Sequence, residues 1–159
     1  MKFEQIPEIT IDELIKSYDA LLFDAYGVLI NSSGPLPKSN CIIDKLNSIK
    51  KPYLILTNDS SRSIAASSKR YGEFGLDIST EKIITSGSLI QNYFLKNNLI
   101  NQSCCVLGTD DTFEYVTKAG GRIVAPKDPF QVLIIGAISG YPFVETASDL
   151  ISRLFSIID

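Results

Sequence analysis

Short apolar runs alternate with amphipathic stretches along almost the whole chain. The apolar runs are of strand length and stop at polar residues or glycine, whereas the amphipathic stretches repeat with a period near 3.6. We expect strands at residues 20–23, 53–56, 83–84, 104–107, 122–125 and 132–135. We expect helices at residues 10–18, 39–50, 61–71, 89–95, 112–118 and 143–158. This order predicts an α/β protein with a largely parallel sheet.

Local signals support some of these boundaries. Thr10 and Glu13 have the spacing of a capping box, and Ser61 or Ser63 is suited to cap the third helix. Residues 26–37 are rich in glycine, proline, asparagine and serine, which are turn formers. We therefore predict that this segment is a surface loop.

The charge balance argues against two classes of partner. Fifteen basic and 18 acidic residues give a net charge of −3, and the isoelectric point is near 5.0. Binding to nucleic acid or to anionic membranes would need a basic field, so we expect neither partner. No apolar run approaches the roughly 20 residues of a membrane-spanning helix. The first residues show no secretory signal, so a cytoplasmic location is expected.

Residue counts exclude several kinds of catalysis. The chain contains no histidine, which rules out a histidine general base and a zinc site with histidine ligands. The three cysteines, at positions 41, 104 and 105, lack metal-ligand spacing. We interpret Cys104 and Cys105 as buried strand residues. Any catalysis must therefore use carboxylates, hydroxyls, lysines or a metal ion.

Two predicted strands end in residues suited to phosphate chemistry. Asp24 directly follows the apolar run that begins the sheet, and Thr57 and Asn58 follow the next strand. Ligands of open α/β sheets bind beyond the carboxyl ends of the strands. A carboxylate can attack phosphorus or bind Mg²⁺, and the Thr57 hydroxyl and backbone N–H groups after Gly27 suit phosphate oxygens. Asp24 could instead be only a turn former, and Thr57-Asn58 only a loop and cap feature.

Together these strand ends resemble the haloacid-dehalogenase-like (HAD) superfamily of hydrolases. Residues 22–29, Leu-Phe-Asp-Ala-Tyr-Gly-Val-Leu, resemble the first motif of the family, and residues 56–58, Leu-Thr-Asn, resemble its second. Residues 57–62 and 84–87 are similar to the NagD-like subfamily, whose α/β cap is inserted after the third strand. The resemblance implies a Rossmann-like parallel sheet, with the first half of the core at 1–85 and the beginning of the cap at 86–159.

The resemblance also assigns roles to individual residues. It implies that Asp24 is the nucleophile and a ligand of Mg²⁺, and that position 26 supplies a backbone carbonyl to the metal and the acid for the leaving group. Thr57 would bind the transferring phosphoryl group, with Asn58 beside it and Gly27 in the phosphate-binding loop. The implied substrate is a phosphorylated small molecule.

Two departures from the family pattern change this expectation. Tyr26 stands where phosphatases of the family have a second aspartate, and a phenol, with a reference pKa of about 10, is a poor acid–base group near neutral pH. The third-motif lysine and the fourth-motif acidic pair are absent from the 159 residues; Lys127 precedes a predicted cap strand, so we interpret it as a solvated turn residue. We therefore expect an incomplete site with weak Mg²⁺ binding and low activity.

Three functional hypotheses follow. The first is a phosphohydrolase that works through an aspartyl-phosphate on Asp24. The alternative is a non-catalytic remnant, or a binding or oligomerisation module on the same scaffold. A carbon–halogen hydrolase is a third, because dehalogenases of the family share the change at position 26. A sheet without its returning strands would leave an exposed edge, which predicts a homo-oligomer or a partner chain.

Overall fold

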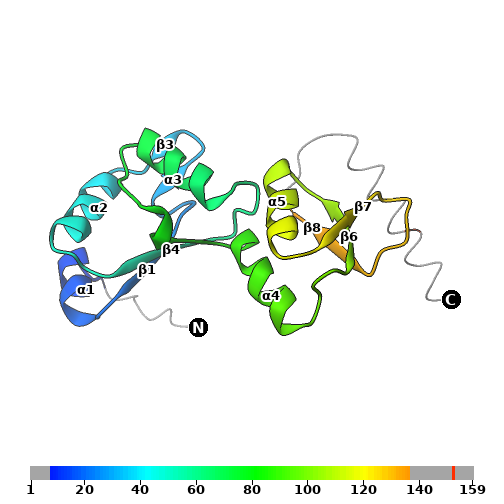
Figure 1. The fold of residues 1–159 in the computed structure, drawn as a ribbon. Coiled ribbons are helices and arrows are strands. Elements are labelled where there is room, and N and C mark those ends of the chain that lie inside the picture. Colours follow the sequence, from blue (N-terminus) through cyan, green and yellow to red (C-terminus); the bar gives the residue numbers. More distant parts are fainter. Residues whose placement is uncertain (1–7, 137–151, 153–159) are drawn as a thin grey trace, which may run out of the picture. The chain divides into compact units, whose positions relative to one another are not determined.

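The computed structural model describes residues 8–136 and residue 152 (Figure 1). By the density of its contacts the chain divides into two compact units. One comprises Met1–Thr57 and Ser68–Ile83, and the other Asn58–Ser67 and Ile84–Asp159. Each unit is an assembly of helices around short strands, as the sequence pattern predicts. The division into a core half at 1–85 and the beginning of a cap at 86–159 stays a prediction.

The first unit is built on parallel strand pairing. Its elements are α1 (Ile11–Ser17), β1 (Leu21–Asp24), β2 (Ile30–Asn31), β3 (Gly34–Pro35), α2 (Ser39–Ser48), β4 (Tyr53–Thr57) and the 3-10 turn η1 (Thr80–Lys82). Two further elements, α3 (Ile64–Glu73) and β5 (Ile83–Thr85), are divided between the units. The strand order is β1-β4-β5, and β1 runs parallel to β4. The α/β class with a parallel sheet is therefore confirmed.

The predicted helix caps are present. The Thr10 hydroxyl accepts the backbone N–H of Glu13, and the Glu13 carboxylate accepts the N–H of Thr10, which completes the capping box. Of the two candidates before α3, Ser63 is the cap, because its hydroxyl accepts the N–H of Ala66 at 3.3 Å. These bonds satisfy N–H groups that the first turn of a helix leaves unpaired.

Residues 26–37 are not simply a surface loop, and this prediction was wrong in part. β2 and β3 form a short antiparallel pair within the segment, and Leu29 and Ile30 are buried. The backbone N–H of Leu36 donates to the Leu29 carbonyl at 2.8 Å. Turn-forming residues dominate the composition of this segment, and strands of two residues are too short to produce a periodic pattern.

The sheet of the first unit buries alternate residues. Leu21 of β1 and Ile55 of β4 are buried together with Ile43 and Leu46 of α2. Leu22 and Leu56 lie on the opposite face and are exposed. One face of the sheet thus belongs to the core, as the two-residue period of a strand requires.

The second unit has its own parallel sheet. Its elements are the 3-10 turn η2 (Gly87–Leu89), α4 (Ile90–Lys96), β6 (Ser103–Leu107), α5 (Asp110–Lys118), β7 (Arg122–Val124) and β8 (Val132–Ile135). The strand order is β7-β6-β8, with both outer strands parallel to β6. Every residue of β6 is buried, and Cys104 packs with Phe94 of α4 and Val116 of α5. The burial predicted for Cys104 and Cys105 is confirmed.

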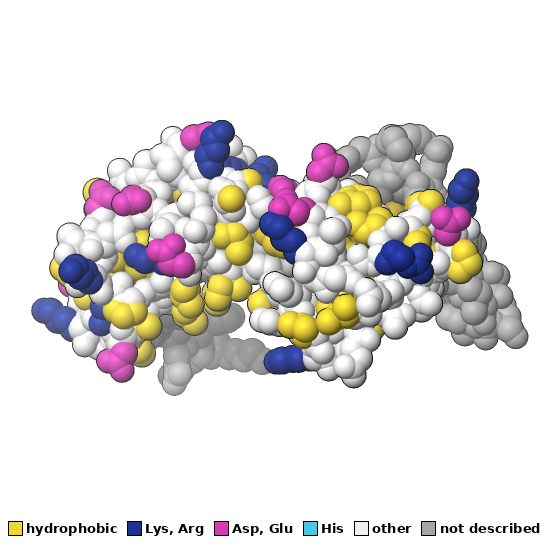
Figure 2. All heavy atoms as spheres, in the orientation of Figure 1, with side chains coloured by type: hydrophobic (Ala, Val, Ile, Leu, Met, Phe, Trp, Pro, Cys, Tyr) yellow, Lys and Arg dark blue, Asp and Glu magenta, His cyan; other side chains and the backbone are white. Residues whose placement is uncertain are grey.

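Three remaining expectations concern the surface and the end of the chain. On the face of each unit drawn in Figure 2, Lys and Arg side chains lie among Asp and Glu, so this face shows no basic field. Lys127 is exposed, as expected for a solvated turn residue. Within the described ranges no helix is long and apolar enough to cross a membrane. The helix predicted at 143–158 lies outside the described residues, apart from Ser152, which is helical.

Candidate active site

The candidate nucleophile, Asp24, is the last residue of β1. β1 pairs in parallel with β4, and the register sets Asp24 opposite Leu56, one residue before Thr57. The carboxyl ends of parallel strands meet at one edge of a sheet, so the pairing brings the two predicted motifs together within the first unit. The sequence predicted these strand ends but not their register.

Asp24 is exposed at the end of its strand. One carboxylate oxygen accepts the backbone N–H of Ala25 at 2.7 Å, while Ala25 itself is buried. This bond orients the carboxylate without enclosing it. An exposed and oriented carboxylate is suited to contact a ligand.

A tight turn follows Asp24 and contains Tyr26 and Gly27. The N–H of Gly27 donates to the Ile30 carbonyl at 2.7 Å, and the N–H of Ile30 donates to the Ala25 carbonyl at 3.0 Å. Gly27 has a φ of +86°, a conformation that a residue with a Cβ adopts only with strain. Because the Gly27 N–H has a protein acceptor, the contribution of this residue is the turn itself. Tyr26, beside it, is 61% exposed.

Thr57 and Asn58 follow at the end of β4 in different environments. Thr57 is almost fully buried, whereas Asn58 is exposed and is the first residue of the second unit. The Asn58 carbonyl accepts a hydrogen bond from the Ser86 hydroxyl at 3.0 Å. The predicted site residues thus lie at the ends of two strands. Asn58 is connected to the others because it directly follows Thr57 in the sequence. Their roles stay a prediction.

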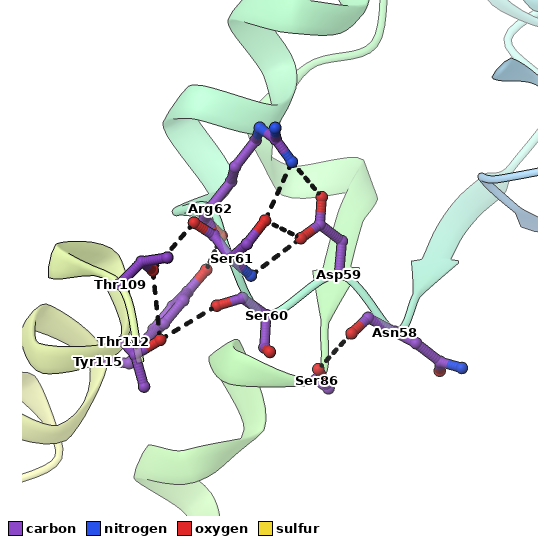
Figure 3. Close-up of polar contacts among 9 residues, drawn as sticks. All are labelled: Asn58, Asp59, Ser60, Ser61, Arg62, Ser86, Thr109, Thr112 and Tyr115. Atoms are coloured by element: carbon purple, nitrogen blue, oxygen red, sulfur yellow. Dashed lines mark hydrogen bonds and ion pairs between the residues drawn. The ribbon is translucent and has the colours of Figure 1, made fainter. Parts of the chain in front are cut away.

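Side chains within the segment after Asn58 hydrogen-bond one another (Figure 3). The Asp59 carboxylate accepts the N–H of Ser61 at 2.9 Å and the Ser61 hydroxyl, and it pairs with the Arg62 guanidinium at 2.8 Å. Burial alone would raise the pKa of Asp59. The hydrogen bonds from Ser61 and the Arg62 charge outweigh it and lower that pKa below its usual range.

Sequence reasoning missed a set of hydroxyls on α5 and its N-cap that contact this segment. Thr109 donates to the Ser61 carbonyl, and Tyr115 donates to the Arg62 carbonyl. The only signal in the sequence is that positions 109, 112 and 115 are three residues apart and so share one helix face. That spacing does not identify a partner 48 to 53 residues away.

The acidic side chains and cysteines of the described residues are not clustered for metal binding. Among them, no group of three Asp, Glu, His or Cys side chains is arranged to hold a metal ion. Mg²⁺, however, is often bound through one or two carboxylates, with phosphate oxygens and water completing the shell. The exposed carboxylate of Asp24 fits that mode of binding.

The chain is similar in sequence and fold to known phosphatases. It is 30% identical over 119 residues to 4-nitrophenylphosphatase of Schizosaccharomyces pombe, covering 74% of this chain and 40% of that protein. A "possible sugar phosphatase" of the HAD superfamily from Cytophaga hutchinsonii matches with a TM-score of 0.75 and 25% identity, over 89% of this chain and 54% of that one.

A third match is the glycerol phosphate phosphatase of Mycobacterium tuberculosis in complex with magnesium. Its TM-score is 0.68 at 21% identity, over 86% of this chain and 42% of that one. The chain thus spans about half the length of these proteins or less.

Residues 21–122, more than half of the chain, match the family described as haloacid dehalogenase-like hydrolase. These residues include the strand that ends at Asp24 and the one that ends at Thr57. The family predicted from those two motifs is confirmed, and the phosphatase matches support the NagD-like branch expected within it. The chain belongs to the haloacid dehalogenase-like hydrolase family.

Proposed function

We propose that this chain carries the nucleophile and phosphate-binding part of a phosphohydrolase that acts on phosphorylated small molecules. The observation that carries the proposal is the register of β1 and β4, which sets Asp24 one residue before the level of Thr57 at the same edge of the sheet. The phosphatases matched by the chain support this reaction class.

The reaction proceeds in two balanced steps. An oxygen of the Asp24 carboxylate forms a bond to phosphorus as the bond to the ester oxygen breaks, and the departing ester oxygen takes a proton from the Tyr26 hydroxyl to leave as the alcohol. Water then hydrolyses the aspartyl-phosphate, which releases inorganic phosphate and restores the carboxylate. The exposure of Asp24 and its bond from the Ala25 N–H support the role of nucleophile.

The remaining site residues bind and orient the phosphate. The Thr57 hydroxyl and the Asn58 side-chain amide are donors suited to phosphate oxygens. Gly27 allows the turn that follows the nucleophile, and its positive φ supports this role. Tyr26 would supply its backbone carbonyl to the metal and its hydroxyl as the proton donor.

We further propose Mg²⁺ as the cofactor, held by Asp24 and the Tyr26 carbonyl. The exposed carboxylate supports it, as does the magnesium complex of the M. tuberculosis phosphatase. When bound, the metal would offset the negative charge shared by the carboxylate and the phosphate. Because the described residues contain no group of three ligating side chains, weak binding is expected.

A second candidate function is phosphate binding without turnover. Tyr26 favours it, because a phenol in place of a carboxylic acid is a poor proton donor near neutral pH. The two candidates share the binding residues and differ only in whether the aspartyl-phosphate forms and breaks down.

A panel of phosphate monoesters, assayed with and without Mg²⁺, tests the proposal. Asp24→Asn removes the nucleophile, and Asp44→Asn makes the same change at an exposed position of α2. We expect metal-dependent turnover that Asp24→Asn abolishes and Asp44→Asn retains. Turnover that survives in Asp24→Asn would refute Asp24 as the nucleophile. A folded wild-type protein that binds phosphate without turnover would establish the second candidate function.

Two further proposals concern the surroundings of the protein. Exposed Leu22 on the edge strand β1 supports self-association of the first unit with a second copy. The cytoplasm is the proposed location, on the grounds of the sequence alone.

A further inference from the structure

The segment Asn58–Arg62 is fixed by hydroxyl groups from outside it (Figure 3). Four of its backbone carbonyls accept hydrogen bonds from four different side chains of the second unit. The donors are Ser86 to Asn58 at 3.0 Å, Thr112 to Ser60 at 3.4 Å, Thr109 to Ser61 at 3.1 Å and Tyr115 to Arg62 at 3.0 Å. Three of the four donors belong to α5 or its N-cap. The path of the segment is therefore set mainly by one helix.

The Tyr115 hydroxyl is the middle of a directed chain of hydrogen bonds. The Ser88 N–H donates to the Thr85 hydroxyl oxygen at 3.1 Å, and the Thr85 and Tyr115 hydroxyl oxygens are 3.1 Å apart. Because Tyr115 donates its proton to the Arg62 carbonyl, the Thr85 hydroxyl must be the donor to Tyr115. Thr85 is fully buried. Each proton in this series of hydrogen bonds thus has one acceptor, which fixes the orientation of the Tyr115 hydroxyl.

Three glycines make room for these donors. A Cβ at Gly87 would lie 2.5 Å from the Tyr115 ring, and a Cβ at either Gly108 or Gly136 would lie 2.6 Å from Thr112. Side chains at these positions would force Tyr115 or Thr112 away from the backbone they now contact. The close approach of α5 to Asn58–Arg62 therefore depends on the absence of a side chain at these three glycines.

We propose that Tyr115, assisted by Thr109, is a positioning residue that holds Asn58–Arg62 in the conformation that presents Asn58 to the substrate phosphate. The inference rests on the proposed function, because Asn58 directly follows Thr57 in the phosphate-binding motif. In this role the Tyr115 hydroxyl acts on the backbone of the segment, through its hydrogen bond to the Arg62 carbonyl.

The test compares Tyr115→Phe with Tyr93→Phe. The first change removes the hydroxyl and keeps the ring against Gly87; the second is the same change at an exposed tyrosine of α4 in the same unit. Two quantities are measured on the full chain, namely the amide hydrogen exchange of residues 58–62 and the dissociation constant of inorganic phosphate in the presence of Mg²⁺.

We expect Tyr115→Phe to speed exchange in residues 58–62 by about tenfold and to weaken phosphate binding several-fold, since a net hydrogen bond corresponds to a change of about that size. Exchange in β6 should stay at the wild-type rate, and Tyr93→Phe should change neither quantity. Thr109→Val provides a second variant, because it removes the donor to Ser61, whereas Thr109→Ser keeps the hydroxyl and should restore both quantities.

Each other outcome overturns the proposal in a distinguishable way. Unchanged exchange in Tyr115→Phe would show that the hydroxyl does not hold the segment. Faster exchange with unchanged phosphate affinity would show an anchor with no role in the site. If the wild-type protein binds no phosphate, the proposed function fails and the positioning role fails with it, while the exchange rates still report on the anchor.

Discussion

Asp24 of β1 and Leu56 of β4 are register partners in parallel strands, so Thr57 lies one residue beyond the level of the Asp24 carboxylate. The relationship places a buried hydroxyl and an exposed carboxylate at the ends of adjacent strands. Substitution of Thr57 is therefore the most direct test of the proposed phosphate site.

We expect Thr57→Val to weaken the binding of inorganic phosphate by about tenfold, because one hydrogen bond to a charged group is lost. Thr57→Ser keeps the hydroxyl and should bind nearly as well as the wild type. Titration calorimetry with phosphate and Mg²⁺ measures both, and urea unfolding checks that the buried position tolerates each change. Equal affinities for the Val and Ser variants would contradict the role of the hydroxyl.

Tyr26→Asp places a carboxyl group at the position where the family resemblance predicts an aspartate. If the phenol limits proton transfer to the leaving group, turnover should rise by about a hundredfold, a typical contribution of a general acid. The measurement is kcat for a phosphate monoester across a range of pH. Tyr26→Phe should lower kcat if the hydroxyl is the proton donor. Turnover that does not respond to either change would remove position 26 from the mechanism.

Gly87→Ala should loosen the segment Asn58–Arg62 through its effect on Tyr115. The added Cβ would lie 2.5 Å from the Tyr115 ring, so the ring must shift, and the shift disturbs its hydrogen bonds with Thr85 and Arg62. We expect a loss of about 1–3 kcal/mol in the free energy of unfolding, the range for overpacking.

Gly72→Ala is the matched control for that change. Nothing lies within 4 Å of its Cβ, and Gly72 is part of α3. This variant should be stabilised by about 0.4–1 kcal/mol, because alanine restricts the unfolded chain. Urea unfolding measures both variants. A Gly87→Ala protein as stable as the wild type would mean that the ring can shift freely.

Tyr53 makes the stability of the first unit depend on pH in the alkaline range. Burial raises the pKa of Tyr53 above its ordinary value of 10.0, despite its hydrogen bond to Asn47. A raised pKa means that the folded state retains the proton longer than the unfolded state does. The stabilisation is therefore complete below about pH 10 and is lost as the pH rises through the raised pKa.

We expect Tyr53→Phe to be less stable than the wild type by about 1 kcal/mol at pH 7, where one hydrogen bond is missing. The difference should shrink above about pH 10, where ionisation penalises only the tyrosine. Urea unfolding from pH 7 to pH 11 measures it, with Tyr18→Phe as the exposed control. A difference that is constant with pH would show that Tyr53 ionises equally in both states.

The exposed Leu22 on β1 predicts concentration-dependent association with a second copy. Light scattering over a range of protein concentrations should detect a dimer, and Leu22→Lys should shift the equilibrium to the monomer. A wild-type protein that stays monomeric at high concentration would reject this prediction.

The sequence by itself determined the alternation of the longer helices and strands among the described residues, and the two strand ends of the candidate site. The signals behind these predictions are local: the capping-box spacing of Thr10 and Glu13 identified the first helix, and the surrounding apolar run indicated that Cys104 and Cys105 are buried. Asp24 and Thr57 were identified because each directly follows an apolar run. No long-range information was needed for any of these predictions.

The tertiary structure alone decided which distant residues meet. The β2–β3 pair was missed because two-residue strands leave no periodic pattern. The bond from Tyr115 to Arg62 spans 53 residues, and a tyrosine on a helix face carries no sign of its acceptor. Register likewise exists only once β1 and β4 pair. These contacts depend on the path of the whole chain, and they decide how rigidly the segment after Asn58 is held.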